Sequence, residues 1–456
     1  MKIGFGRAVI TPPVGFSLVG YFNDRRSTGI RDELCATACL LEDRGTLFAL
    51  VSVDLVWVDA SVVARVRELA GKMTGIPASN VLVHATHTHT GPLPEFSEES
   101  IYQKGFYVEP CYIEMLPVYI AGCIKAAHEN MKESCLGTGT TRAEGLAFNR
   151  RYLMKDGRII TNPWDKPEEI VEAAGPVDDT LGVLKITDRK TGKLTGIIVN
   201  FACHPDTLGD NLISGDWPGM LRNKLKRRFP GTEVLVLNGP SGDINHINPA
   251  DPGRRGVEVP DHIAGTLEGK TAGLLKRVKT AGGMRMETYY RKFSLPARKV
   301  SGAELKSAKA VLKEKNLPSD SLQHMISSSL VVSAKQYSSG RKSFALEING
   351  FSLGKELLVL GLPGEVFTAI GAGVKQEAPF KQTFIAQNSN AHLGYVPSWT
   401  AFMQEDRDFA IKPGYGRQSL TESFGIDCSY ETSPLCCKVG RSVEEVFLRA
   451  AGSLLK

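Results

Sequence analysis

The sequence predicts an α/β fold in which a mixed β-sheet core is flanked by helices. Helix-like and strand-like periodicities alternate along the 456 residues, as they do in mixed folds. The apolar runs are short and rich in Val and Ile, which is typical of strands covered on both faces. Hydrophobic residues make up 42% and charged residues 23% of the chain, and these proportions exclude fibrous and disordered proteins.

Six segments are predicted to be strands because each is a Val- or Ile-rich run bounded by turn residues. The first ends at a carboxylate, Asp54, and the second runs directly into a cluster of histidines. The predicted strands comprise residues 46–54, 80–86, 196–201, 232–239, 357–364 and 384–386.

Helices are predicted where capping-box patterns precede apolar residues at helical spacing. Ser301 with Glu304 opens one such segment, and Ser442 with Glu445 opens another near the end of the chain. Five basic residues between 222 and 228 also follow helical spacing, and they are interpreted as a solvated helix face.

The domain prediction is a single catalytic domain over residues 1–456, with a weak seam near residues 284–344. Two long polar stretches, residues 156–179 and 247–261, are rich in Pro, Gly and charge. Loops of this length inside a compact domain are usually functional or disordered. We therefore expect them to shape a binding site.

Charge and cysteine content indicate the compartment and the partners. Lys plus Arg exceed Asp plus Glu by six, too small an excess to demand nucleic acid or an anionic membrane. We expect no integral membrane association, because no uninterrupted apolar run reaches the length of a bilayer span, and the N-terminus shows no signal-peptide core. The nine cysteines form no C-x-x-C pair, which favours reduced thiols in a cytoplasmic protein.

Three of the nine histidines lie within six residues, at His84, His87 and His89, where a predicted strand runs into a Gly-Pro turn. Side chains two residues apart on an extended segment point to the same side, so His87 and His89 should face one space. Such a pair can bind a metal or act in acid–base catalysis. The alternative is a set of histidines used for hydrogen bonding in the core.

Four further polar segments follow predicted strands. They are residues 200–206, which contain His204; residues 237–246; residues 361–365, which end at Glu365; and residues 388–397. Taken singly, His204 could be a metal ligand or a hydrogen-bonded core residue. The last two segments, taken singly, favour turns over catalytic roles.

Together these segments resemble the catalytic domain of the neutral (non-lysosomal) ceramidases, zinc amidases that hydrolyse N-acyl sphingosine. The family blocks T-H-T-H-S-G-P, N-R, F-A-x-H-P with N-L-I-S-G-D, P-G-E and N-x-Y-x-x-Y are similar, in this order, to residues 86–92, 149–150, 201–216, 363–365 and 390–395. The blocks are weak singly, but their shared order makes the resemblance specific.

The resemblance implies a Zn²⁺ ion held by His87, His204, Glu365 and Tyr395, with His89 and Arg150 placed to orient substrate and stabilise developing negative charge. These nitrogen and oxygen ligands suit zinc, whose bound water can ionise near neutral pH and attack a carbonyl. Carboxylates are expected either to orient the histidines or to stabilise turns; the candidates are Asp54, Asp216 and Asp243.

The sequence also departs from the family. Where the family has a serine in G-D-x-S-P, this chain has Asn245 followed by His246, and His392 replaces a family tyrosine. No appended immunoglobulin-like domain is expected. We therefore predict a zinc-dependent hydrolase that cleaves an amide, or a related carbonyl ester, of a small polar substrate contacted by Asn245, His246 and His392.

Two other functions remain compatible with the residues. The metal site could act on a lactone or a glycosidic bond, an idea motivated by the missing serine. Alternatively, the chain could be a non-catalytic binding protein that retains a structural metal.

Overall fold

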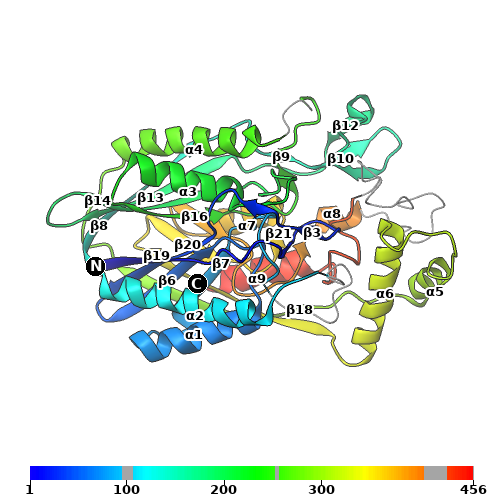
Figure 1. Cartoon of the computed structure of the whole chain (residues 1–456), viewed down its shortest axis with the longest axis horizontal. Coiled ribbons are helices and arrows are strands. Elements are labelled where there is room, and N and C mark those ends of the chain that lie inside the picture. The colour runs from blue at the N-terminus through cyan, green and yellow to red at the C-terminus, as the bar shows by residue number, and fades with distance from the viewer. Residues whose placement is uncertain (95–105, 252–255, 405–428, 455–456) are drawn as a thin grey trace.

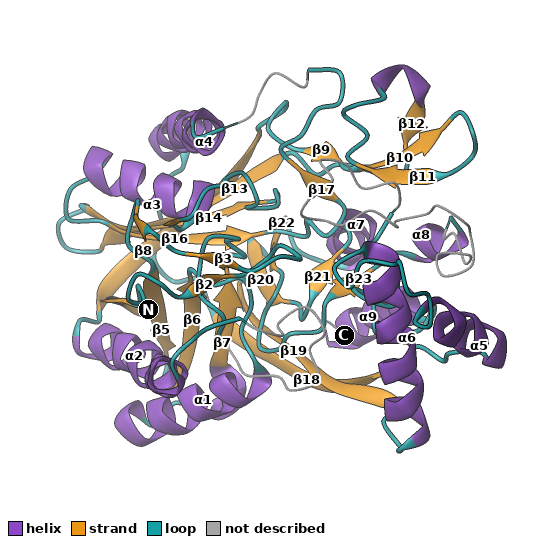
Figure 2. Cartoon of the chain, turned by 45° about the vertical axis from the view of Figure 1, so that its right-hand side comes forward, coloured by secondary structure: helices purple, strands orange, loops and turns teal. Residues whose placement is uncertain are grey.

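Two β-sheets stack face to face at the centre of the molecule, with helices on the outer face of each (Figures 1 and 2). The computed structural model describes residues 1–94, 106–251, 256–404 and 429–454. The larger sheet has the order β16 (Glu233–Asn238), β14 (Leu194–Phe201), β13 (Thr180–Asp188), β8 (Lys132–Arg142), β1 (Lys2–Val9), β5 (Cys35–Asp43), β6 (Thr46–Val53), β7 (Val81–Ala85). The smaller has the order β18 (Met286–Pro296), β19 (Ser343–Leu353), β20 (Leu357–Gly361), β22 (Gln382–Ala386).

Apolar side chains fill the space between the two sheets. Phe48 of β6 and Phe351 of β19 meet there, with ring centroids 5.0 Å apart. Helices α1 (Ala60–Thr74), α2 (Pro110–Glu129), α3 (Asp216–Arg228) and α4 (Glu258–Arg277) cover the larger sheet, and α7 (Thr368–Glu377) and α9 (Val443–Leu454) the smaller. Both sheets are therefore buried on both faces, which explains the continuous Val- and Ile-rich runs and confirms the predicted fold class.

The larger sheet consists of two halves joined at one corner, because β1 and β8 pair only through Lys2–Glu133 and Ile3–Lys132. Hydrogen bonds across the molecule bring the strand ends of both halves together. Ser52 Oγ donates to Val236 O at 2.8 Å, and the backbone N–H of Asn238 donates to His84 Nε2 at 3.0 Å. The carboxyl ends of β7, β16 and β22 thus meet at one place.

All six predicted strands form, and no end is shifted by more than three residues. The run 357–364 ends early: β20 stops at Gly361, and Glu365–Val366 forms a separate short strand, β21, paired with β23 (Tyr395–Val396). The capping box at Ser301 and Glu304 is present at the start of α5 (Gly302–Val311).

The interpretation of residues 222–228 as a solvated face is wrong for one member. Arg222 is buried in α3 and forms an ion pair with buried Asp54. Its position falls on the helix face that packs against the sheet, where a charge needs an opposite partner. Lys224, Lys226 and Arg228 form pairs that are partly open to solvent.

The polar stretch 156–179 is more ordered than predicted. It contains β11 (Ile159–Thr161), the 3₁₀ turn η2 (Pro167–Glu169) and β12 (Ile170–Ala173), and both strands pair with β10 (Arg151–Met154). In the second stretch, α4 already begins at Glu258, and residues 252–255 lie outside the described ranges.

The region of the expected seam carries β18 and then α5 and α6 (Leu322–Ser338), which form an apolar cluster of their own. The remaining short elements are β2 (Ser17–Leu18), β3 (Arg25–Arg26), β4 (Gly29–Ile30), η1 (Ala78–Asn80), β9 (Phe148–Asn149), β15 (Leu212–Ile213), β17 (Ile244–Asn245) and α8 (Trp399–Met403).

Within the described ranges, no helix combines the length and the apolar character needed to cross a bilayer. No disulfide joins the eight cysteines placed by the structure, and five of them are buried. The ninth, Cys428, lies outside the described residues.

Candidate active site

His87 and His89 face one space, but not for the reason that the sequence suggests. Strand β7 ends at Ala85, and His87 has φ 76°, in the left-handed region. A non-glycine residue in this region is strained by roughly 1–3 kcal/mol and is usually held by its surroundings. Here the His87 amide donates to Leu55 O at 2.9 Å and the His89 amide donates to Pro205 O at 3.1 Å. A turn, rather than strand alternation, therefore aims the two imidazoles.

His84 is a core residue that forms hydrogen bonds, as the alternative interpretation of the histidine cluster predicts. It is fully buried, its Nδ1–H donates to Gln387 O, and its Nε2 accepts the Asn238 amide at 3.0 Å. Burial lowers its pKa to about 4, so the ring is neutral at pH 7. His84 joins the strand ends that carry the site.

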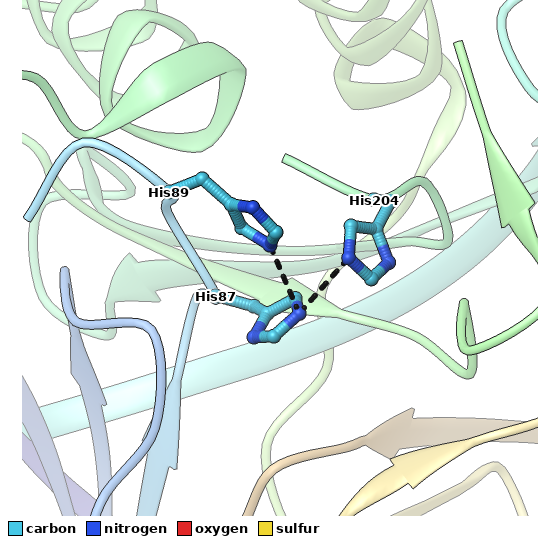
Figure 3. Close-up of side chains that lie close together, drawn as sticks. All are labelled: His87, His89 and His204. Carbon is cyan, nitrogen blue, oxygen red and sulfur yellow. Dashed lines mark hydrogen bonds between the residues drawn. The ribbon is translucent and has the colours of Figure 1, made fainter. Parts of the chain in front are cut away.

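Three imidazoles converge beyond these strand ends (Figure 3). His87 Nε2 lies 3.1 Å from His204 Nε2 and 3.4 Å from His89 Nε2. Glu365 Oε2 lies 3.2 Å from His87 Nε2 and 3.9 Å from His204 Nε2. The structure thus brings together His87, His89, His204 and Glu365 from segments far apart in the chain.

Glu365 and Tyr395 are neighbours because β21 and β23 are parallel and pair these two residues directly. The Glu365 amide donates to Gly394 O at 2.9 Å. The preceding Gly364 has φ 81°, and a Cβ atom there would lie 2.9 Å from Gly394 O, so only glycine fits this close approach. Both Glu365 and Tyr395 line the same cavity as His87.

The ring orientations leave a space that suits a cation. His87 Nδ1–H donates to Val56 O at 2.6 Å and His204 Nδ1–H donates to Ser241 O at 3.1 Å. Because carbonyl oxygens only accept, both Nε2 atoms carry lone pairs that face each other. Burial, with the charge of Arg150, lowers the pKa of His204 to about 3, so the ring of His204 is neutral at neutral pH. Glu365 Oε2 likewise has no hydrogen-bond donor. Two imidazoles and a carboxylate in this arrangement fit a divalent metal ion.

The three carboxylates considered as histidine partners all stabilise loops instead. Asp54 pairs with Arg222, Asp216 accepts from the hydroxyl of Thr207 at 2.7 Å, and Asp243 accepts from the hydroxyl of Thr368 at 2.8 Å. Backbone carbonyls orient the histidines in their place.

Gln387 is a supporting residue that the sequence analysis missed. Its Oε1 accepts from the amides of Ser241 at 3.0 Å and Val366 at 3.1 Å, and its Nε2 donates to Ser241 Oγ at 2.6 Å. It therefore joins the loop that orients His204 to the strand that carries Glu365. The only sequence feature that could have identified Gln387 is its position as a polar residue directly after the predicted strand 384–386.

Arg150 is close to the site but does not line the cavity. It is fully buried, its Nε lies 2.9 Å from Glu431 Oε1, and its Nη2 donates to Gly242 O at 2.8 Å. The guanidinium lies 5.2 Å from the ring centre of Tyr395 and 5.4 Å from that of Tyr430. The guanidinium thus lies beside the ring of Tyr395.

The three predicted substrate contacts are placed differently. His246 lines the cavity, and its Nδ1 lies 3.3 Å from Asp206 Oδ1. His392 lines it too and stacks on Trp57, with ring centroids 4.0 Å apart. Asn245 is fully buried and bonds to Asn162 and Ile247, so it shapes the wall from behind.

The cavity measures about 850 Å³, which is within the usual range for sites that bind small molecules. Its described lining is rich in aromatic residues and also contains four histidines and three carboxylates, namely His87, His89, His246, His392, Asp206, Asp210 and Glu365. Parts of both predicted polar stretches contribute, namely residues 161, 162 and 164 and residues 247, 256 and 257.

Comparison with known proteins gives consistent matches. The family model for the neutral/alkaline non-lysosomal ceramidase N-terminal region matches residues 1–234, which include His87, His89, Arg150 and His204. A neutral ceramidase of Pseudomonas aeruginosa is 26% identical over 228 residues, 48% of this chain and 32% of that protein. Neutral ceramidase B of Dictyostelium discoideum is 30% identical over 213 residues, 44% of this chain and 28% of that protein.

Solved structures extend the likeness to the second half of the chain. The crystal structure of the Pseudomonas aeruginosa neutral ceramidase aligns with a TM-score of 0.70 at 18% identity, over 99% of this chain and 74% of that one. A structure of a ceramidase complexed with C2 aligns with a TM-score of 0.71 at 17% identity, over 100% of this chain and 74% of that one.

In sequence, the matched region spans about a third of the length of the curated relatives. The family model, in contrast, covers just over half of this chain. The predicted resemblance is therefore confirmed, and the chain belongs to the neutral/alkaline non-lysosomal ceramidase family, a family of hydrolases.

Proposed function

We propose that this protein is a zinc-dependent hydrolase that cleaves an amide, or a related carbonyl ester, of a small polar molecule. The observation that carries this proposal is the convergence of His87 Nε2, His204 Nε2 and Glu365 Oε2, with both Nδ1 atoms fixed by backbone carbonyls. Relatives named ceramidases, which are amide hydrolases, support the choice of bond.

His87, His204, Glu365 and Tyr395 would hold the cation at the wall of the cavity. When bound, a zinc ion lowers the pKa of water and polarises a carbonyl oxygen. Burial raises the pKa of Tyr395 well above its usual value, and the guanidinium of Arg150 opposes this rise. Arg150 therefore favours the phenolate form of Tyr395, and its charge also acts on His204 directly.

His89 is placed to bind the reacting carbonyl. Burial and the neighbouring imidazoles lower its pKa well below the usual value, so its ring is neutral. Its Nδ1 has no partner, and its Nε2 points to the ligand cluster. A proton on Nε2 would be donated to the oxygen on which negative charge develops, a contribution of about 3 kcal/mol.

The lining of the cavity favours a neutral or amine-bearing substrate. Its charged residues within the described ranges, apart from histidines, are the carboxylates Asp206, Asp210 and Glu365. An anionic group on the substrate would be repelled by Asp206. Rings such as those of Tyr21 and Trp57 provide flat apolar surfaces for the substrate. An N-acylated amine or amino sugar matches these features.

The test combines metal analysis with a substrate panel of N-acyl, ester, lactone and glycoside compounds. We expect one zinc ion per chain and turnover of N-acyl compounds. His87→Ala should lose the zinc and lower turnover by at least about 10³-fold, because the cation provides both the activated water and the polarised carbonyl.

His128→Ala, in α2 and away from the cavity, is the matched control and should retain both zinc and turnover. Little zinc together with unchanged turnover in His87→Ala would contradict the proposal. Exclusive lactone or glycoside turnover would assign the site to a different bond, and tight zinc without any turnover would indicate a binding protein.

A further inference from the structure

A second imidazole–carboxylate pair lies in the cavity, outside the set of candidate metal ligands. His246 Nδ1 lies 3.3 Å from Asp206 Oδ1, and the two side chains are 8% and 13% exposed. Both residues line the main cavity, and His246 also lines an adjoining cavity of about 690 Å³. The ring of His246 is therefore held inside the protein but can be reached by a bound molecule.

The backbone around His246 is built to hold this orientation. Asn245 Oδ1 accepts the amide of Ile247 at 3.0 Å, which closes a tight turn with His246 at its centre. Asn245 Nδ2 donates to Asn162 Oδ1 at 3.1 Å and so fixes the turn to the neighbouring loop. Asp206 is held through its backbone, because its carbonyl accepts the hydroxyl of Tyr21 at 3.1 Å.

The pairing determines which nitrogen of His246 can react. An ionised carboxylate only accepts hydrogen bonds, so a proton lies on Nδ1, and in the neutral imidazole the lone pair is on Nε2. This is the arrangement in which a carboxylate orients a histidine for proton transfer and stabilises the imidazolium that forms.

The other ionisable groups around His246 are also mainly acidic. Asp216 lies close enough to Asp206 and His246 to interact with both electrostatically. Across the adjoining cavity, Asp251, Glu258 and His262 complete the ionisable lining. A positive charge that forms briefly on His246 would face carboxylates on both sides.

The other histidines of the site are less suited to this role. The Nε2 atoms of His87 and His204 face the cation position, and His89 Nε2 points to the same cluster. His392 lies flat on the Trp57 ring. Asn245, which replaces the family serine, has an amide already engaged in two hydrogen bonds and carries no proton to transfer at neutral pH.

We propose that His246, oriented by Asp206, transfers a proton from the attacking water to the leaving group. This inference rests on the proposed hydrolase function. As the water oxygen forms its bond to the carbonyl carbon, His246 Nε2 takes up one proton of the water. When the C–N bond breaks, its electron pair goes to the nitrogen, which receives that proton from Nε2, and His246 is neutral again.

Two acetyl compounds with different leaving groups test the role. The aniline nitrogen of acetanilide must be protonated to leave, whereas the nitrophenolate of p-nitrophenyl acetate leaves without a proton. In the zinc-loaded protein, His246→Gln should lower kcat for acetanilide by roughly 10²- to 10⁴-fold, and for the ester by at most about tenfold. Asp206→Asn, which keeps the shape of the side chain, should show a smaller loss with the same dependence on leaving group.

His262→Gln is the matched control, since His262 lines only the adjoining cavity, and it should leave both rates unchanged. Equal losses for both compounds, a rise in KM alone, or unchanged rates in His246→Gln would overturn the role of His246. Those outcomes leave the proposed function intact as long as the unaltered protein shows zinc-dependent turnover. Failure of the unaltered protein to hydrolyse either compound would contradict both proposals.

Discussion

Two parts of the cavity lining are built in different ways. The strand-end lining consists of His87 and His89, which follow β7, and of Glu365 and Tyr395, which lie in the paired strands β21 and β23. The loop lining, which consists of residues 20–23, 162–164, 206–210 and 256–257, belongs to the connections between elements. Both face the same space.

The strand-end lining is held by buried polar contacts that leave little choice of geometry. His84 connects β7 to residues 238 and 387, and Gln387 connects residues 241 and 366. The side chains of the loop lining are more exposed than those of the strand-end lining. From this difference we propose that the strand ends would determine where a cation is held, and that the loops would determine which molecule fits beside it.

The largest effect is expected at His84, which supports the strand ends. Its pKa in the folded protein is about 4, below the ~6.5 of an exposed histidine, so the unfolded chain binds the proton first as the pH falls. The free energy of unfolding should therefore decrease between pH 6.5 and pH 4, by about 3 kcal/mol from this residue alone.

His84→Gln should flatten this part of the pH dependence, as measured by urea unfolding at several pH values. The partly exposed His128 supplies the mutational control, since His128→Gln removes an imidazole but leaves His84 in place. Identical slopes in His84→Gln and the unaltered protein would show that His84 does not stabilise the strand ends in its neutral form.

A smaller effect is expected at Gln387. Gln387→Met keeps a similar volume but leaves the amides of Ser241 and Val366 without acceptors. Because these segments orient His204 and Glu365, zinc affinity should fall by about 10- to 100-fold. Competition with a chromophoric chelator would measure it.

The matched control is Gln323→Met, a buried glutamine in α6. It should alter the stability of its own cluster and leave zinc affinity unchanged. If Gln387→Met held zinc as tightly as the unaltered protein, the strand-end lining would not depend on this residue.

The smallest effect is expected in the loop lining. Trp164 lines the cavity and is partly exposed. Trp164→Ala should raise KM by roughly tenfold through lost apolar contact with substrate, while zinc content and kcat change little. A loss of zinc in Trp164→Ala would show that the two linings are not independent.

Local sequence patterns predicted the secondary structure and several of the site residues. The Val- and Ile-rich runs predicted the six strands, because burial on both faces requires such runs. The spacing of His87 and His89 identified two convergent imidazoles, but attributed their convergence to strand alternation. The turn at His87 depends on acceptors at Leu55 and Pro205, which no local pattern contains.

Local residue patterns could not predict contacts between segments that are distant in the sequence. Residue patterns marked the segments that contain Glu365 and Tyr395, but only the family resemblance assigned the two residues to one site, since their pairing depends on the parallel register of β21 and β23. Gln387 carried no recognisable motif, and Arg222 was assigned to the wrong face because its partner, Asp54, lies 168 residues away.

The sequence by itself determined the class of fold, the strands and the chemical types of the groups that follow them, because burial and side-chain chemistry are local properties. Only the tertiary structure decided which of those groups meet. Backbone carbonyls set the tautomers of His87 and His204, and the return of the chain at residues 365 and 395 completes the cluster. Hydrogen bonds and charges act over a few ångströms in space, whatever the separation of the residues along the chain.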